Sequence, residues 1–207
     1  MRMRKKKNGE ARVNACADYL ISSVDDIKLS KCLPAELEIG CGKGRFICET
    51  AKANPDKSYI AVELSTDALI TALENAQAEN IPNVKFINVN ARELVNYFKK
   101  GEIKVIYLNF SDPWPKARHA KRRLTYRSFL EIYKELLPED GKVCFKTDNR
   151  ALFDFSLEEF AECGWRVEDV TYDLHSSPYN EGNIMTEYEK NFSEKGFTIN
   201  RLVAYVK

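Results

Sequence analysis

Short runs rich in β-branched and aromatic residues alternate with helix-like patterns along most of this 207-residue chain. The runs that predict strands are residues 35–40, 58–64, 83–89, 103–110 and 141–147. Between them, apolar residues recur at helical spacing over 65–80, 91–98 and 125–137, and Ser65 is a candidate cap for the first of these helices. Successive parallel strands need a right-handed crossover, usually a helix. The alternation therefore predicts an α/β fold with a mostly parallel sheet and helices on both faces.

The C-terminal part has a different pattern. Two further strand patterns, 165–174 and 197–207, are separated by the polar segment 175–196. This segment is too polar for a packed crossover helix over its full length, so we expect the last strands to pair antiparallel at a sheet edge, with the segment on the surface. The chain length suits one full domain, and no linker or repeat divides it.

Composition excludes several classes of protein. No apolar stretch approaches the roughly 20 residues that a membrane-spanning helix needs, and no apolar segment follows the N-terminal cations as in a secretory signal. We therefore expect a cytoplasmic protein without membrane contact. The six cysteines form no C-x-x-C pair and there are only two histidines, which predicts reduced thiols and no metal site.

The net charge is only +1, but the cations are concentrated in two places. Residues 1–12 contain six Lys or Arg and one Glu, and residues 116–127 contain six Lys or Arg and no acid. Either run alone is explained by a solvated surface. Together they favour a defined face that binds a polyanion.

A glycine-rich loop follows the first predicted strand, in "LEIGCGKGRF". Gly40, Gly42 and Gly44 let the backbone approach a ligand where the strand turns into a helix, and the helix supplies free N–H groups, so we assign them to a cofactor loop. A dinucleotide fingerprint would need glycine where Arg45 stands, and a P-loop would need Ser or Thr after Lys43. Both phosphate-binding interpretations are weakened.

Polar side chains mark the ends of the first three strands. Glu38 precedes the loop, where it would repel a pyrophosphate but suits an ammonium or a sulfonium. Glu63 is placed to accept from both hydroxyls of a ribose, and Asn90 is placed to meet an adenine ring. Each acid alone is equally well explained as a helix cap or a surface ion pair. Together the three positions predict S-adenosyl-L-methionine as the cofactor.

The fourth strand is followed by "DPWPKARHAKRR". In an open α/β sheet the ligand lies across the carboxyl ends of the strands, so Asp112 should face the same crevice as Glu38 and Glu63. The cations from Lys116 to Arg123 lie beyond it along the chain. This order predicts an acid at the reacting centre and a strip that binds phosphates next to it.

Five segments resemble the bacterial tRNA (guanine-N7-)-methyltransferases: "LEIGCGKG", "AVELS", "NFSDPWPKARHAKRRL", "KTDN" and "TEYEKNFSEKG". The resemblance runs from the N-terminal part to the last strand. It implies a Rossmann-like class I methyltransferase fold, with a mostly parallel seven-stranded sheet and an antiparallel last strand, in a single domain 1–207 with a basic N-terminal arm of about residues 1–12. It also implies transfer of a methyl group from S-adenosyl-L-methionine to N7 of the guanosine at position 46 in the variable loop of tRNA, giving 7-methylguanosine.

The same resemblance implies roles for individual residues. Contact with the cofactor is implied for Glu38, Glu63, Asn90 and Asp112, of which Asp112 is also the catalytic residue. Contact with the substrate is implied for Lys116, Asp148, Thr186, Glu187, Tyr188 and Glu189. Contact with RNA is implied for Arg118, His119, Ala120, Lys121, Arg122 and Arg123. The family usually has aspartate where this chain has Asn90, and an amide still accepts through its oxygen and also donates.

The implied chemistry needs few groups, because guanine N7 carries a lone pair and no proton, and attack on the methyl carbon requires no general base. His175, Tyr172 and Tyr179 are interpreted as core or edge-strand residues.

Three alternative functions stay open. The first is an aminopropyltransferase, although its cationic substrates conflict with the cations after Asp112. The second is an amino-group DNA methyltransferase, although Trp114 replaces the second proline of its motif, and the third is an RNA-binding module with a vestigial cofactor loop. A monomer and a homodimer are both open.

Overall fold

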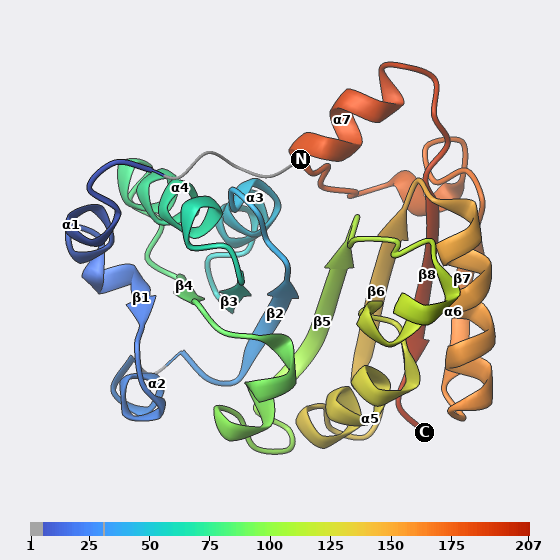
Figure 1. Cartoon of the computed structure of the whole chain (residues 1–207), viewed down its shortest axis with the longest axis horizontal. Helices are drawn as coiled ribbons and strands as arrows, with labels where there is room; N and C mark the ends of the chain where they lie inside the picture. The colour runs from blue at the N-terminus through green and yellow to red at the C-terminus, as the bar shows by residue number, and fades with distance from the viewer. Residues whose placement is uncertain (1–5, 31) are drawn as a thin grey trace.

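A computed structural model describes residues 6–30 and 32–207, and its centre is an eight-stranded sheet in the order β1-β4-β3-β2-β5-β6-β8-β7 (Figure 1). The strands are β1 (Leu20–Ile21), β2 (Ala35–Ile39), β3 (Ser58–Val62), β4 (Val84–Ile87), β5 (Ile103–Asn109), β6 (Lys142–Thr147), β7 (Arg166–Thr171) and β8 (Asn200–Tyr205). Only β8 runs antiparallel to its neighbours, β6 and β7. The predicted parallel sheet with an antiparallel last strand is confirmed. The eighth strand, β1, was not predicted, because two residues are too few to show a period.

The helices are α1 (Gly9–Asn14), α2 (Val24–Ser30), α3 (Arg45–Ala53), α4 (Thr66–Ala78), α5 (Arg127–Leu136), α6 (Arg150–Glu162) and α7 (Glu187–Ser193), with 3₁₀ turns η1 (Ala17–Tyr19), η2 (Ala91–Asn96), η3 (Ala117–Arg122) and η4 (Pro178–Asn180). The predicted helices after the glycine loop, over 65–80 and over 125–137 correspond to α3, α4 and α5, and the described residues contain four further α-helices. Ser65 caps α4 as predicted, its Oγ accepting from the Ala68 N–H. The segment 91–98 differs from expectation, since it folds as a 3₁₀ turn. Its short length after the cap at Asn90 suits this tighter geometry.

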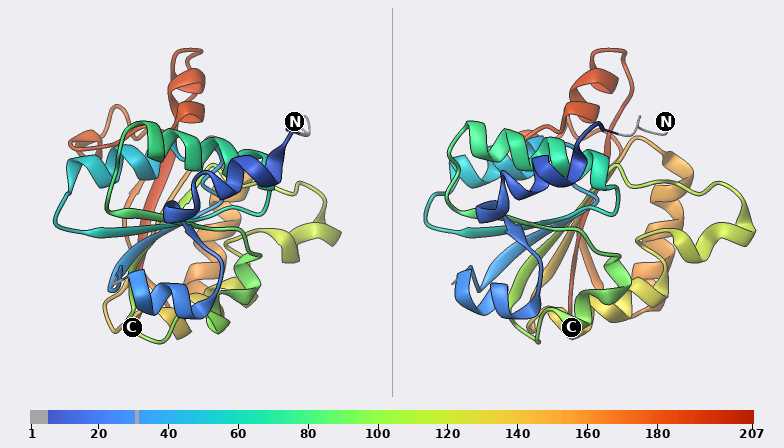
Figure 2. Two further views of the ribbon diagram at one scale, coloured as in Figure 1. Left: turned by 90° about the vertical axis from the view of Figure 1, so that its left-hand side faces the viewer. Right: turned by 60° about the vertical axis from the view of Figure 1, so that its left-hand side comes forward.

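Helices cover both faces of the sheet (Figure 2), and the core has two layers, one on each face. Alternation along β3 sends Tyr59 and Ala61 to the face covered by α3 and α4, and Ile60 and Val62 to the face covered by η2, α5 and α6. Ile60 is fully buried, and burying such a side chain contributes about 2 kcal/mol to stability. Both faces are therefore packed, as a parallel sheet requires.

The chain changes direction in the sheet at β2. This strand pairs with β3 on one side and with β5 on the other, so the connections after β2 and β5 leave in opposite directions. Such a switch point leaves a crevice at the carboxyl ends of the two strands. In Figure 1, α7 stands above this end of the sheet, and in Figure 2 the segment after β5 projects away from the body.

The last two strands form the predicted antiparallel pair at the sheet edge. The segment between them, 175–196, carries η4 and α7 and is largely exposed. Glu189 is the exception, with no exposed surface at all. The expectation of a surface segment is therefore wrong at this residue, which has buried partners described below.

Candidate active site

The three glycines of the loop after β2 have different surroundings. All have a positive φ, of 80° at Gly40, 57° at Gly42 and 78° at Gly44, a conformation that other residues rarely adopt. A Cβ atom added to Gly40 or Gly42 would meet nothing within 4 Å, whereas one at Gly44 would lie 2.8 Å from the Cβ of Ala72 on α4. Gly40 and Gly42 therefore border open space at the crevice, and Gly44 lets the loop pack on α4.

This difference predicts that one substitution mainly lowers stability and the other mainly weakens cofactor binding. We expect Gly44→Ala to lower the free energy of unfolding by about 3 kcal/mol, through overpacking against α4 added to the strained φ. Gly42→Ala should cost only about 1–2 kcal/mol for the φ strain, but should weaken cofactor binding more, because its methyl group enters the ligand space. Chemical denaturation and calorimetric titration measure the two effects. A larger loss of stability in Gly42→Ala than in Gly44→Ala would contradict the assignment of Gly44 to packing and Gly42 to the crevice.

Glu38 is a buried carboxyl group at the end of β2, with 2% of its surface exposed. The Asn109 side chain on β5 donates to Oε1 at 2.9 Å, while Oε2 is buried without a hydrogen-bond partner in the described part of the chain. Burial, assisted by the nearby Glu63, raises the pKa of Glu38 to about 7, although Asn109 and the Lys146 charge lower it. A buried oxygen without a partner favours a ligand that brings a donor or a positive charge.

Glu63 and Asn90 lie after the next two strands of the sheet. The Glu63 carboxylate accepts from the Gly42 N–H and the Ser65 N–H, both at 2.8 Å, which fixes its orientation and leaves each oxygen a second lone pair. The Asn90 oxygen accepts from the Arg92 N–H at 2.9 Å and so caps η2. The Asn90 Nδ2 group takes no part in this cap.

Two adjoining cavities run along the carboxyl ends of the strands. The larger, of about 570 Å³, is lined by residues that include Glu63, Leu64, Asn90, Asp112, Trp114 and Phe129. The smaller, of about 200 Å³, is lined by residues that include Glu38, Gly42, Lys43, Thr186, Glu187 and Tyr188. Gly40 and Phe110 line both. The structure thus brings residues from four strand ends and from α7 to one crevice, where an apolar wall formed by exposed Leu64 suits a flat ring.

The loop that carries Asp112 is held in an uncommon conformation. Phe110 and Trp114, on either side of the exposed Asp112, have positive φ values of 52° and 41°, which are unusual for aromatic residues and concentrate at functional sites. Arg123 holds the loop by donating to the carbonyl oxygens of Pro113 and Trp114, both at 3.1 Å. The Arg123 guanidinium also lies 4.2 Å from the centre of the Phe155 ring.

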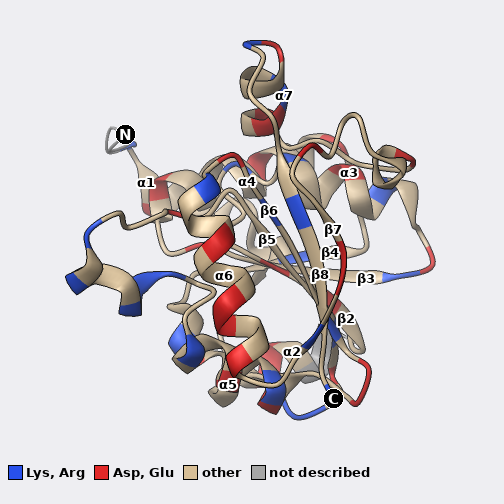
Figure 3. Cartoon of the chain, turned by 90° about the vertical axis from the view of Figure 1, so that its right-hand side faces the viewer, with Lys and Arg blue, Asp and Glu red and all other residues tan. Residues whose placement is uncertain are grey.

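The other side chains of the predicted strip divide into two groups. Arg122 lies over the Trp114 ring at 4.7 Å and His119 meets that ring edge-on at 5.7 Å, so both pack on the loop. Lys116, Arg118 and Lys121 are exposed, as is Arg122, but these three make no ring contact within the described chain. Figure 3 shows cations along the projecting segment. These three are the cations best placed to meet phosphates, and Ala120 offers only backbone.

Sequence reasoning missed Arg92, which lies two residues after Asn90. Its guanidinium donates to the Lys121 carbonyl oxygen at 2.7 Å and lies 4.5 Å from the Phe129 ring. It therefore connects η2 to η3 and also lines the larger cavity. No pattern in the sequence pointed to this contact, because the two residues are far apart along the chain.

The substrate segment predicted at 186–189 begins α7. The Thr186 hydroxyl accepts from the Glu189 N–H at 2.8 Å, which caps the helix. Glu187 pairs with Lys43 of the glycine loop at 3.0 Å. Tyr188 donates to Asp148 at 3.3 Å, and burial, followed by this carboxylate, raises the Tyr188 pKa to about 12. Thr186, Glu187 and Tyr188 line the smaller cavity, and Asp148 lies next to it through its hydrogen bond with Tyr188.

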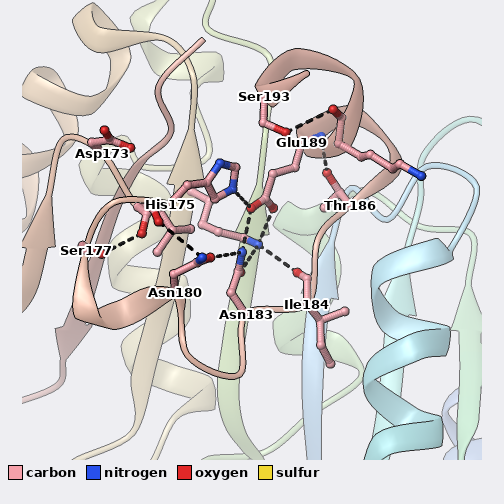
Figure 4. Close-up of polar contacts among 12 residues, drawn as sticks. Asp173, His175, Ser177, Asn180, Asn183, Ile184, Thr186, Glu189 and Ser193 are labelled. Atoms are coloured by element: carbon pink, nitrogen blue, oxygen red, sulfur yellow. Dashed lines mark hydrogen bonds and ion pairs between the residues drawn. The ribbon is translucent and has the colours of Figure 1, made fainter. Parts of the chain in front are cut away.

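Glu189 does not lie in the crevice. Figure 4 shows its carboxylate inside a cluster of side chains. It accepts from Lys146 Nζ at 2.7 Å, from Asn183 Nδ2 at 2.8 Å and contacts His175 Nε2 at 3.0 Å. His175, interpreted as a core or edge residue, belongs to this cluster. Lys146 was missed, although a lysine inside the apolar run "KVCFKT" was the signal available.

Two kinds of feature are absent from residues 6–30 and 32–207. No group of three or more His, Cys, Asp or Glu side chains could hold a metal ion there. None of the helices described in that part is long and apolar enough to cross a membrane.

Glu38 and Glu63 lie at the ends of neighbouring strands, and Glu38 is buried with one oxygen that has no hydrogen-bond partner among the described residues. This pair of carboxylates suits a ligand with a ribose and a cationic tail. Comparisons with known proteins agree with this chemistry. A family model described as "Putative methyltransferase" matches residues 33–202. Solved structures with this fold include "Structure of an antibiotic related Methyltransferase" (TM-score 0.68, 18% identity, covering 90% of this chain and 95% of that one). Another is the 16S rRNA methyltransferase KamB (TM-score 0.67, 13% identity, covering 90% and 94%).

Curated relatives match almost the whole chain. A "tRNA (guanine-N(7)-)-methyltransferase" of Streptococcus uberis (strain ATCC BAA-854 / 0140J) is 46% identical, over 99% of this chain and 100% of the relative. A protein of the same name from Geobacillus sp. (strain WCH70) is 47% identical, over 97% and 94%. Identity at this level over the full length confirms the resemblance found in the sequence motifs. The chain is a methyltransferase and belongs to the family of the tRNA (guanine-N(7)-)-methyltransferases.

Proposed function

We propose that this enzyme transfers a methyl group from S-adenosyl-L-methionine to N7 of a guanine in tRNA. The observation that carries the proposal is the crevice itself, in which the buried carboxyl of Glu38 and the exposed carboxylate of Asp112 border one pair of adjoining cavities. A projecting cationic segment begins directly after Asp112. A tRNA substrate implies that the protein works in the cytoplasm.

The residues of the crevice fit the cofactor. S-adenosyl-L-methionine, when bound, supplies an electrophilic methyl group on a sulfonium. Glu38 Oε2 is the oxygen left to accept from a cationic tail, and Glu63 keeps lone pairs for ribose hydroxyls. Gly40 and Gly42 leave space for close backbone approach. Asn90 would meet the adenine ring through Nδ2.

The chemistry asks the protein mainly to hold groups in line. Because guanine N7 carries no proton, the described side chains need not supply a general base, and alignment provides much of the rate enhancement. Positive charge moves onto the purine during transfer, so the Asp112 carboxylate stabilises the product side electrostatically. Asp112 or Asp148 would also accept from N1 and N2 of guanine, which an adenine does not offer. Asp112 is thus our proposed catalytic residue.

The target must be accessible. The edge of guanine that carries N7 lies in the deep major groove of regular RNA helix, which side chains do not reach. The enzyme must therefore meet a loop or a loosened pair, and the family resemblance points to the guanosine at position 46 in the variable loop. Lys116, Arg118 and Lys121 would contact phosphates there.

Mapping the modified nucleotide tests this function. Unmodified tRNA is incubated with the purified chain and labelled cofactor, and the product is digested and sequenced after cleavage at 7-methylguanosine. We expect one site, lost in a transcript whose guanosine at position 46 is changed to adenosine. Label on an exocyclic amine would favour the amino-group methyltransferase. Transfer of an aminopropyl group from the decarboxylated cofactor to a polyamine, in a separate assay without tRNA, would favour the aminopropyltransferase. Cofactor binding without any transfer would favour an RNA-binding module.

The basic N-terminal arm remains a proposal. Residues 1–5 lie outside the described part of the chain. Lys6 and Arg12 are held on α4: the Lys6 backbone N–H donates to Asp67 at 2.7 Å, its ammonium contacts Thr71, and Arg12 donates to both oxygens of Glu74 at 2.7 and 2.8 Å. An arm that contacts the tRNA would therefore extend from a segment that is fixed on α4.

Deleting residues 1–8 should weaken tRNA binding and flatten its dependence on salt, because each lost phosphate contact lowers the slope by about 1. Filter binding at several salt concentrations measures the slope. Arg12→Ala is the matched control, since Arg12 is already paired with Glu74 and its loss should leave the slope unchanged. An unchanged slope after the deletion would remove the arm from the proposal.

A further inference from the structure

Lys146 and Glu189 form an ion pair inside the protein, with side chains 8% and 0% exposed. The three N–H groups of Lys146 have three acceptors: Glu189 Oε2 at 2.7 Å, the Asn183 side-chain oxygen at 3.1 Å and the Ile184 carbonyl at 3.1 Å. Glu189 Oε1 is taken by Asn183 and His175. Both oxygens of Glu189 are thus engaged and enclosed, and neither faces the cavity that the rest of the segment lines (Figure 4).

The pair lies between two sides of the active site. Lys146 is on β6, next to β5, and its backbone carbonyl accepts from the N–H of Phe110, the residue with positive φ just before the Asp112 loop. On the other side, Tyr188 directly precedes Glu189. Its ring lies 5.0 Å from the Phe110 ring, and its hydroxyl donates to Asp148, two residues beyond Lys146. The Lys146–Glu189 pair and the two Tyr188 contacts therefore connect the start of α7 to the ends of β5 and β6, next to Asp112.

We propose that Glu189 is a positioning residue and makes no substrate contact: through Lys146 it fixes the start of α7, so that Glu187 and Tyr188 face the smaller cavity. The assignment of that cavity to the substrate rests on the proposed function. The physical reason is that a buried charge without its partner is costly, so the pair strongly disfavours undocked positions of α7. A segment held in this way offers its contacts already oriented.

A set of variants separates positioning from contact. Glu189→Gln leaves Lys146 buried without its counter-charge, and should lower kcat/KM for tRNA by about 100-fold while cofactor affinity, measured by calorimetry, stays within about threefold of the parent. The double variant Lys146→Met with Glu189→Leu removes both charges, and apolar pairs of similar size replace buried ion pairs well. It should recover at least tenfold of the activity lost in Glu189→Gln. Glu194→Gln, the same change at an exposed carboxylate close to the end of α7, is the control and should match the parent.

If Glu189 bonds the substrate directly, the double variant lacks that bond as well and will be no more active than Glu189→Gln. That result would overturn the proposal. The same holds if Glu189→Gln retains full activity.

A second measurement does not depend on activity. Hydrogen exchange of the backbone amides in 186–196, measured without tRNA, should be faster in Glu189→Gln than in the parent and unchanged in Glu194→Gln. Equal exchange in Glu189→Gln would overturn the proposal even if activity falls. If the parent does not methylate tRNA at all, the proposed function fails while the exchange result still decides the role of Glu189.

Should Glu189→Gln fail to fold, Asn183→Ala replaces it. This change removes hydrogen bonds to both Lys146 and Glu189 without leaving a charge alone, so it should speed exchange in 186–196 and lower kcat/KM in the same direction but less. Parent-like exchange in that variant would count against the proposal.

Discussion

Asp112→Asn is expected to lower kcat for methyl transfer by about 10³-fold, with little change in the affinity for tRNA. The substitution keeps the size of the side chain and the conformation of the loop between Phe110 and Trp114, and removes only the negative charge. Loss of one preorganised electrostatic contact to a transition state typically costs this much. Single-turnover kinetics with saturating enzyme measure the chemical step, and filter binding measures the affinity.

Two further variants sharpen the result. Asp148→Asn tests whether the carboxylate beside Tyr188 shares the task, and Asp56→Asn, an exposed acid before β3, controls for the change of net charge. Substantial turnover in Asp112→Asn would remove this residue from the proposed chemistry. A loss in Asp148→Asn alone would transfer the role to the other acid.

Glu38→Gln is expected to weaken cofactor binding by about 100-fold at pH 8, because the removal of one member of a buried charge pair typically costs 2–5 kcal/mol. The pH dependence gives a second criterion. The Glu38 pKa is raised to about 7 by burial, so in the parent a proton competes with the cationic cofactor below pH 7, and affinity should fall by up to tenfold per pH unit. In Glu38→Gln this slope should disappear.

The stability of the cofactor-free enzyme depends on pH in the opposite direction to the cofactor affinity. The folded state binds the Glu38 proton more tightly than the unfolded state, so this group stabilises the free enzyme fully below its ordinary pKa of 4.5 and loses that contribution as the pH rises to about 7. Calorimetric titration from pH 6 to 8.5 measures the first trend, and chemical denaturation from pH 4.5 to 8.5 measures the second. Glu36→Gln is the matched control: Glu36 lies two residues earlier on β2, is also buried, and pairs with Lys57 and Tyr107. A parent-like pH slope in Glu38→Gln would show that another group titrates.

The sequence predicted those parts of the site that follow from the ends of parallel strands. Glu38, Glu63 and Asp112 could be placed at one edge of the sheet because strand direction and crossover hand decide which ends meet. The glycine loop could be placed, but not the separate task of Gly44, since that depends on the approach of Ala72 on another helix.

Contacts between distant segments escaped prediction. No pattern near Glu189 in the sequence indicates its pairing with Lys146. The motif "TEYE" is as consistent with an exposed helix start as with a buried one. Arg123 could not be told from Arg118 in a run of cations, because the difference lies in the carbonyl groups of Pro113 and Trp114 that Arg123 binds. Charge patterns predict that a strip is basic, whereas the fold determines which of its cations remain free to bind phosphates.

The placement of Trp114 on the wall of the larger cavity gives the enzyme an intrinsic optical reporter. The chain has only two tryptophans. The other, Trp165, is buried against Phe160, and its Nε1 has no hydrogen-bond partner among the described residues, so Trp165→Phe removes background emission without breaking a hydrogen bond. In that single-tryptophan protein, the fluorescence of Trp114 would follow ligand arrival and departure by stopped flow, without any attached dye.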